Sequence, residues 1–225
     1  MIQNLHRLVV NFVEIHGAHG YLIHNFLSPL SNNRTDQYGG SFQNRIRIAL
    51  NIAKRIRAEV GESFLIFFRL SGTDWADFPE EDESTGEWKQ WGVKQSSQLV
   101  RLLKEEAGVD LVDVSSGGLW SQQKIPIGPG YQVPLAEYIK QRNPDVLISS
   151  VGSITDGQQA EDILQKGQAD VVRAAREFLR NKDFVLNVRI NYSKISDIWC
   201  INSPIVRYEA RSRRPTDTPV REGMG

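Results

Sequence analysis

The chain has 225 residues, with 27 basic and 27 acidic side chains and no formal net charge. This balance argues against a broad nucleic-acid surface, which needs a basic excess, and no apolar run approaches the length of a membrane span. Cys200 is the single cysteine, so an internal disulfide is excluded, which fits a reducing compartment. The first residues also lack the cleavage site of a signal peptide, and we expect a cytoplasmic protein.

Five short apolar runs predict buried strands. They are Phe12–Ile15, Phe64–Leu70, Val109–Ser116, Asp145–Ser153 and Ala169–Ala175. The second run is nearly continuous, as expected for a strand of a parallel sheet that is covered on both faces.

Apolar side chains at helical spacing between these runs predict four helices. The first stripe extends from Phe42 to Val60, with Ser41 as its N-cap and Gly61 as its stop. Shorter stripes lie at residues 99–107, 135–139 and 160–164, and Gly108 and Gly167 follow the first and last of these three.

Strands that alternate with helices predict an α/β fold with a parallel sheet. A doubly wound nucleotide-binding sheet would usually carry a glycine-rich turn of the form G-x-G-x-x-G after its first strand, and "HGAHGY" does not match it. A (β/α)8 barrel is therefore favoured. Polar residues stand at the carboxyl ends of the predicted strands, where barrel enzymes place their sites: His16, Arg69, Ser115, Gly152 and Arg176. Five strands, however, do not close an eight-stranded barrel.

Three of the four histidines fall between Glu14 and Arg45. A zinc site is disfavoured, because their spacing lacks H-E-x-x-H and no second Cys or His cluster exists. His24 lies among apolar residues and is expected to be structural, for example by donating to a backbone carbonyl in a turn. His16 and His19 flank two small residues at a strand end, where two imidazoles could donate to one oxygen or anion. Tyr21 could add a phenolic proton.

The segment "VEIHGAHGYLIHNFLSPLSNNRTDQYGGSFQNR" resembles the corresponding segment of the Old Yellow Enzyme family of FMN-dependent ene-reductases. The match continues through "FFRLSGTDW", "VDVSSGG", "VGSITDGQQAEDILQKGQADVV" and "AAREFLRN", and covers roughly residues 12–190. The segments "DVSSGG" and "AREFLRN" are most similar to the branch that includes bacterial and fungal NADPH dehydrogenases.

The resemblance implies an NAD(P)H oxidoreductase that reduces activated alkenes, such as small α,β-unsaturated carbonyl compounds. The pair at His16 and His19 would hydrogen-bond the substrate oxygen, while hydride passes from flavin N5 to the β-carbon. Tyr21 would lie near the substrate as a secondary candidate. FMN would be the cofactor, and NADPH or NADH the reductant.

The resemblance also implies flavin contacts. Arg69 would stand beside flavin N1 and the C2 oxygen, although a salt bridge at a strand end is the structural alternative. Two pairs would hold the phosphate: Gly152 and Ser153 after one strand, and Ala175 and Arg176 after the next. Ser116 and Gly117 would lie near the flavin.

The chain departs from the family at its start, whereas the segment "PIVRYEARSRRP" resembles the tail of the related branch. Residues 1–11 are an atypical start, residues 12–190 match the C-terminal part of the flavin-binding barrel with about its last five strands, and residues 191–225 form a tail that we expect to be partly disordered. We expect the N-terminal strands of the barrel to be missing. The basic tail, with Arg207 and Arg211 as candidates, would reach a neighbouring subunit in a homo-oligomer.

Two other functions compete with this prediction. One is a truncated, catalytically inactive remnant of such an enzyme. The other is an unrelated phosphate-binding barrel enzyme, although no lysine stands at a strand end where an aldolase would form its Schiff base. The sequence does not reveal the physiological substrate, the preference between NADH and NADPH, or the oligomeric state.

Overall fold

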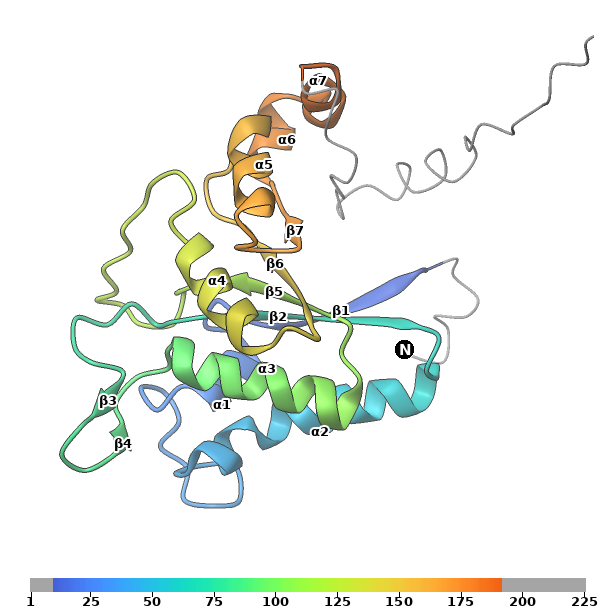
Figure 1. Ribbon diagram of the computed structural model, residues 1–225. Coiled ribbons are helices and arrows are strands. Elements are labelled where there is room, and N and C mark those ends of the chain that lie inside the picture. Colours follow the sequence, from blue (N-terminus) through green and yellow to red (C-terminus); the bar gives the residue numbers. More distant parts are fainter. Residues whose placement is uncertain (1–9, 192–225) are drawn as a thin grey trace, which may run out of the picture.

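The computed structural model describes residues 10–191, so that Cys200, the basic tail and the first nine residues lie outside the described part of the chain. Its centre is a five-stranded parallel sheet in the order β1-β2-β5-β6-β7 (Figure 1). The strands are β1 (Phe12–Gly17), β2 (Leu65–Ser71), β5 (Leu111–Ser115), β6 (Leu147–Ser150) and β7 (Val171–Val172). The predicted α/β fold with a parallel sheet is confirmed.

Seven helices and a hairpin complete the described residues. The helices are α1 (Leu22–Leu27), α2 (Phe42–Val60), α3 (Val93–Ala107), α4 (Val133–Arg142), α5 (Gly157–Gln165), α6 (Arg176–Arg180) and α7 (Phe184–Asn191), and the hairpin pairs β3 (Glu81–Asp82) with β4 (Glu87–Trp88). The four predicted helices correspond to α2, α3, α4 and α5. The sequence did not reveal α1, α6, α7 or the hairpin.

Local capping explains where the longest helix begins and ends. The hydroxyl of Ser41 accepts a hydrogen bond from the amide of Asn44 at the start of α2, at 3.3 Å. Gly61 ends the helix with φ 79°, and its amide donates to the carbonyl of Arg57. Gly108 ends α3 in the left-handed region with φ 59°, a conformation that glycine adopts without steric cost. The predicted caps at Ser41, Gly61 and Gly108 are confirmed.

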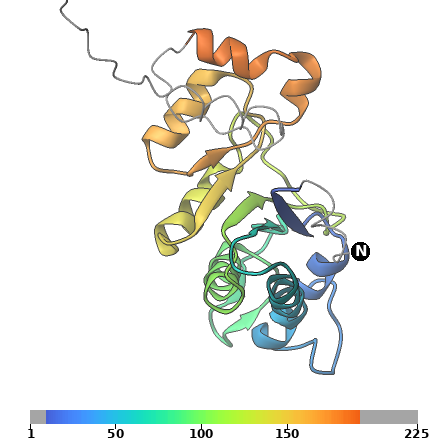
Figure 2. The same ribbon diagram turned by 90° about the vertical axis from the view of Figure 1, so that its right-hand side faces the viewer.

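The main core lies on one face of the sheet. Ile66, Phe68 and Leu70 alternate along β2 and are fully buried against apolar side chains of α2, α3 and α4. In Figure 1, α2 and α3 lie side by side below the sheet. Figure 2 shows α5, α6 and α7 grouped at the β7 end, away from α2 and α3. A second small core joins α5 to Val172 of β7.

Side chains on the opposite face of the sheet form a separate and smaller apolar cluster. An apolar layer of Phe12, Leu65, Phe67, Leu111 and Val171 lies at one end of the strands. Phe12 and Phe67 stack there with ring centroids 4.7 Å apart. Beyond this apolar layer, toward the carboxyl ends of the strands, the same face carries charged side chains, among them Glu14 and Arg173. The contact between these two side chains shows how strongly the sheet curves.

Arg173, which follows β7, forms an ion pair with Glu14 of β1 at 2.7 Å. These strands are the two edges of the sheet and are four positions apart. Neighbouring strands lie about 4.8 Å apart, so in a flat sheet the two edges would be roughly 19 Å apart. One ion pair can join them only because the sheet curls and the face opposite the main core is concave.

Candidate active site

The carboxyl ends of β1, β2 and β5 bring together residues that are distant in the sequence. His16 is the register partner of Arg69, Arg69 is the partner of Asp113, and Ser71 is the partner of Ser115. Because side chains alternate along a strand, these residues all point to the concave face.

The three side chains predicted to be catalytic meet at the end of β1. The ring of His16 lies 5.4 Å from the ring of His19 and 5.4 Å from the ring of Tyr21, measured between centroids. His16 and Tyr21 are exposed, whereas His19 is half-buried. Two imidazoles and a phenol therefore face a common, solvent-accessible position.

The turn that carries His19 has an unusual backbone. His19 has φ 59° and Gly20 has φ 75°, and a non-glycine residue with positive φ is uncommon. The amide of His19 donates to the hydroxyl of Ser71 at 3.0 Å, and the amide of Gly20 donates to Nδ1 of His24 at 2.9 Å. Such strain persists when surrounding contacts over-determine the conformation, and here two side chains hold consecutive amides.

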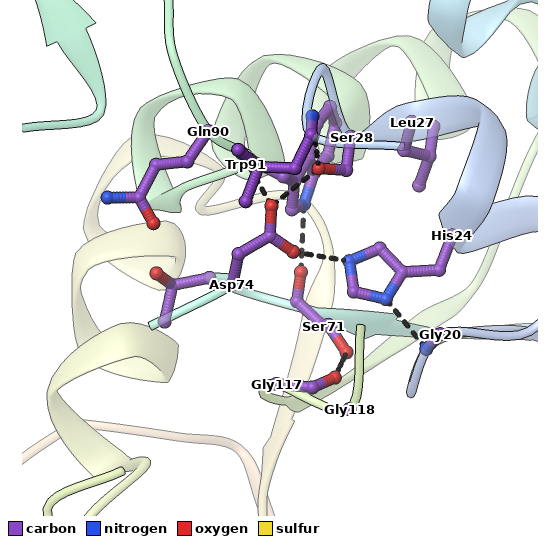
Figure 3. A network of polar contacts seen from close by, with 12 residues as sticks. Gly20, His24, Leu27, Ser28, Ser71, Asp74, Gln90, Trp91, Gly117 and Gly118 are labelled. Carbon is purple, nitrogen blue, oxygen red and sulfur yellow. Dashed lines mark hydrogen bonds and ion pairs between the residues drawn. The ribbon is translucent and has the colours of Figure 1, made fainter. Parts of the chain in front are cut away.

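A buried polar network supports this turn (Figure 3). Nε2 of His24 lies 3.0 Å from a carboxylate oxygen of Asp74, and both side chains are fully buried. The other oxygen of Asp74 accepts from the hydroxyl of Ser28 at 2.6 Å and from the amide of Trp91 at 2.9 Å. The indole of Trp91 donates to the carbonyl of Ser71 at 2.8 Å. His24 is structural as expected, but its partners are an amide and a carboxylate, not a backbone carbonyl.

Burial and neighbouring cations keep the two candidate catalytic histidines neutral. Burial is the largest cause that lowers the pKa of His19, to about 4, with Arg69 and His16 adding to it. The pKa of His16 is also lowered, first by burial and then by Arg69. Both rings are therefore neutral imidazoles near pH 7, each with one N–H donor and one acceptor nitrogen.

Arg69 has the ion-pair partner that an arginine in a buried strand requires. Its Nε lies 3.0 Å from Asp113, which is fully buried and also contacts Arg173 at 2.9 Å and the hydroxyl of Ser149 at 2.7 Å. Burial raises the pKa of Asp113, and Arg173 and Arg69 oppose that effect. Sequence analysis missed Asp113 and Arg173, although each is a charged residue inside an apolar run.

The residues predicted to bind phosphate follow β6 and β7. Gly152 has φ 122° and Ser153 has φ 52°, so the chain turns sharply after β6. Ala175 and Arg176 are exposed, and Arg176 is the first residue of α6. Within the described part of the chain, no carboxylate forms an ion pair with Arg176.

Gly152 packs against a residue that sequence analysis did not single out. A Cβ atom at Gly152 would lie 2.8 Å from Nε2 of Gln132. Gln132 is buried just before α4, and its amide oxygen accepts from the hydroxyl of Ser116 at 2.5 Å. Gly117 is likewise engaged within the protein, because its amide donates to the carbonyl of Thr73 at 2.8 Å. The flavin contacts of Ser116 and Gly117 stay predictions.

A family model described as "NADH:flavin oxidoreductase / NADH oxidase family" matches residues 10–194. The chain belongs to this family. The resemblance to Old Yellow Enzymes is thereby confirmed, and the family and its members' names support FMN as cofactor with NADH or NADPH as reductant.

Two curated members of this flavin oxidoreductase family show the extent of the match. NADH:flavin oxidoreductase FG08077 of Gibberella zeae is 50% identical over 178 residues, which are 77% of this chain and 42% of that protein. An NADPH dehydrogenase of Geobacillus sp. is 48% identical over 171 residues, 76% of this chain and 46% of the relative. The chain thus spans less than half the length of these relatives.

A solved structure supports the fold. The complex of 2-naphthoyl-CoA reductase with 2-naphthoyl-CoA superposes with a TM-score of 0.71, at 24% identity, over 88% of this chain and 28% of that protein.

None of the helices within residues 10–191 is both long and apolar enough to cross a membrane. In the same range, no group of three or more His, Cys, Asp or Glu side chains is arranged to hold a metal ion.

Proposed function

We propose that this chain is an FMN-dependent NAD(P)H oxidoreductase that reduces activated alkenes, with small α,β-unsaturated carbonyl compounds as substrates. One observation carries the proposal: two neutral imidazoles and a phenol converge at the carboxyl end of β1, beside the fixed guanidinium of Arg69. A substrate oxygen placed there meets hydrogen-bond donors whose positions are fixed by the strand and its turn, which is the arrangement that stabilises developing negative charge.

His16 and His19 act as the donors to that oxygen. A neutral imidazole N–H polarises a carbonyl without giving up its proton, and polarisation makes the β-carbon of the substrate more electrophilic. The network around His24 and Asp74 keeps His19 in its left-handed turn, so that its ring stays beside that of His16. Tyr21, exposed next to His16, is a secondary contact for the substrate.

The residues present fit FMN. Arg69 is partly exposed on the concave face and would lie against the pyrimidine edge of the flavin. Gly152, Ser153, Ala175 and Arg176 would hold the phosphate, and the guanidinium of Arg176 is exposed and has no ion-pair partner among residues 10–191. Ser116 and Gly117 would lie near the ring system. FMN supplies, when bound, the capacity to take electrons from NADH or NADPH and to pass them on as hydride.

We further propose that the sheet is five strands of an eight-stranded barrel. Two features support this: the strands lie in the sheet in their chain order, and the ion pair between Arg173 and Glu14 requires a strong curl. The remaining alternative is a catalytically inactive remnant, favoured by the two edges of the sheet at β1 and β7, beside which no further strand lies among residues 10–191. A cytoplasmic location and a homo-oligomer through the tail stay predictions.

The experiment is reconstitution with FMN. The purified chain is refolded with FMN and desalted, and its visible absorbance is recorded before and after anaerobic addition of NADPH and then of 2-cyclohexenone. We expect a retained flavin band that NADPH bleaches and the enone restores. In the same assay, His16→Ala should lower enone turnover about 10²–10³-fold with flavin retained. If the chain retains no flavin, or if NADPH does not bleach the band of the retained flavin, the chain is the inactive remnant.

A further inference from the structure

His19 is a neutral imidazole, so its chemistry depends on which ring nitrogen carries the single proton. Its Nε2 lies 2.6 Å from the hydroxyl oxygen of Ser115. A serine hydroxyl either donates to a ring nitrogen or accepts from it. The direction of this hydrogen bond therefore fixes the tautomer of His19.

The side chain of Gln132 determines that direction. Its Nε2 donates to the carbonyl of Val151 at 3.1 Å, and because a carbonyl only accepts, the amide nitrogen must face Val151. The amide oxygen consequently faces the hydroxyls of Ser115, at 3.3 Å, and Ser116, at 2.5 Å. An amide oxygen only accepts, so both hydroxyls donate to it.

Packing holds Gln132 in this orientation. Its side chain is 2% exposed, and Gly152 leaves the space that its amide nitrogen fills. Ser115 and Ser116 are also buried. With water excluded from these contacts, the hydroxyl proton of Ser115 has two acceptors within reach, the oxygen of Gln132 and Nε2 of His19. The amide oxygen cannot carry a proton itself, whereas Nε2 can, so both contacts are hydrogen bonds only when Ser115 donates to Gln132 and accepts from Nε2.

We infer that Gln132, acting through Ser115, is a positioning residue that fixes His19 in the Nε2–H tautomer. Ser115 gives its only proton to Gln132 and offers a lone pair to His19, so Nε2–H donates to Ser115. The lowered pKa of His19 agrees with a single ring proton. The consequence for catalysis, which rests on the proposed function, is that a substrate oxygen replaces Ser115 as the acceptor of the Nε2–H of His19.

The test is a tautomer measurement by long-range ¹H–¹⁵N NMR on the full, ¹⁵N-labelled chain without flavin, with His19→Asn to assign the ring. We expect the Nε2–H tautomer in the unaltered chain. Gln132→Met removes the acceptor but keeps the side-chain length, so the hydroxyl proton of Ser115 can turn to Nε2, and the Nδ1–H population should rise several-fold. Nδ1–H in the unaltered chain, or an unchanged tautomer ratio in Gln132→Met, would overturn the inference.

Two controls separate this effect from loss of fold. Ser116→Ala removes the other hydroxyl on the same amide oxygen and should leave the tautomer of His19 unchanged. His24 reports on the fold in each spectrum, because the Gly20 amide at its Nδ1 requires the Nε2–H form. If Gln132→Met loses that signal, Ser115→Ala takes its place and should lower the Nε2–H population toward that of a free histidine side chain. The measurement uses no flavin, so failure to bind FMN would reject the proposed function and leave the tautomer assignment standing.

Discussion

His24 makes two different polar contacts, and each ring nitrogen can be replaced separately. Nδ1 accepts a hydrogen bond from the amide of Gly20, and Nε2 lies 3.0 Å from a carboxylate oxygen of Asp74. The first contact positions the turn that carries His19, and the second places the ring beside a buried carboxylate. A lost partner for a buried group costs about 1–3 kcal/mol, and more when that group is charged.

His24→Asn keeps an acceptor near the position of Nδ1 but cannot reach Asp74, whereas His24→Gln keeps a donor toward Asp74 but loses the acceptor. We expect both to lower the free energy of unfolding in urea by about 1–3 kcal/mol. Only His24→Gln should move the amide resonance of Gly20 and the ring resonances of His19. Equal shifts in both variants would mean that Gly20 is held by something other than Nδ1.

The neutral state of His19 predicts a pH dependence of stability. Its pKa falls from 6.5 in the unfolded chain to about 4 in the folded protein. Between these values the unfolded state binds more protons, so the stabilisation is fully present above pH 6.5 and is lost as the pH falls toward 4. The lowered pKa of His16 acts in the same direction.

We therefore expect the urea midpoint to fall between pH 6.5 and pH 4.5, and to fall less in His19→Asn, because asparagine does not titrate there and tolerates the left-handed backbone. A parallel series of urea curves for the two proteins measures the difference. Identical pH profiles would contradict the assigned protonation state of His19.

At the scale of elements, the turn at Gly20 and the loop after β5 are packed backbone to backbone. A Cβ atom at Gly20 would lie 2.2 Å from the carbonyl oxygen of Gly118, and one at Gly118 would lie 2.6 Å from Cα of His19. Gly40 offers a matched control, because its φ of 77° is close to the 75° of Gly20 but no atom lies within 4 Å of its Cβ position.

Gly20→Ala and Gly40→Ala should both lose about 1–2 kcal/mol for placing a side chain in the left-handed region. Gly20→Ala should lose more, and it alone should shift the ring resonances of His19, because the loop after β5 must move. Urea unfolding and a histidine-ring NMR spectrum of each variant measure the two effects. Equal destabilisation would show that the two loops are not in close contact.

Local sequence patterns were sufficient to predict helices of several turns and elements that are bounded by a clear capping residue or a glycine. The stripe from Phe42 to Val60, with its serine cap and terminal glycine, predicted α2 to the residue. The run Asp145–Ser153 predicted a strand that proved shorter, Leu147–Ser150, because the positive φ angles of Gly152 and Ser153 take the chain out of the sheet. The two-residue strands of the β3–β4 hairpin and the six-residue α1 are too short for any period to show.

The same contrast applies to the site. His16, His19 and Tyr21 were recognisable because they lie within six residues of one another, and β1 with its turn brings their rings together. Gln132 and Asp74 could not be found this way, because their contacts form only after two loops fold onto the site. Asp74 then contacts His24, and Gln132 contacts Ser115, the hydrogen-bond partner of His19. The link between Asp113 and Arg173 spans 60 residues and depends on strand register.

For the whole molecule, the curl of the sheet is the property on which the site depends, and one pair of charges reports on it. Glu14 lies on one edge strand and Arg173 directly follows the other, and their side chains touch only because the sheet is curved. In a flat sheet they would be roughly 19 Å apart, a separation at which mutational effects are additive.

A double-mutant cycle with Glu14→Gln and Arg173→Met tests this curvature in solution. Arg173→Met also takes a partner from the fully buried Asp113, so the single variant should lose about 3–5 kcal/mol of unfolding free energy. We expect a coupling between positions 14 and 173 of about 0.5–3 kcal/mol. Lys89→Met, which alters an exposed ion pair with Glu87 on the β3–β4 hairpin, should be additive with Arg173→Met. Zero coupling between Glu14 and Arg173 would mean that the edges of the sheet do not meet. In that case the sheet would have no concave face to present His16, Arg69 and the proposed phosphate-binding residues to one flavin.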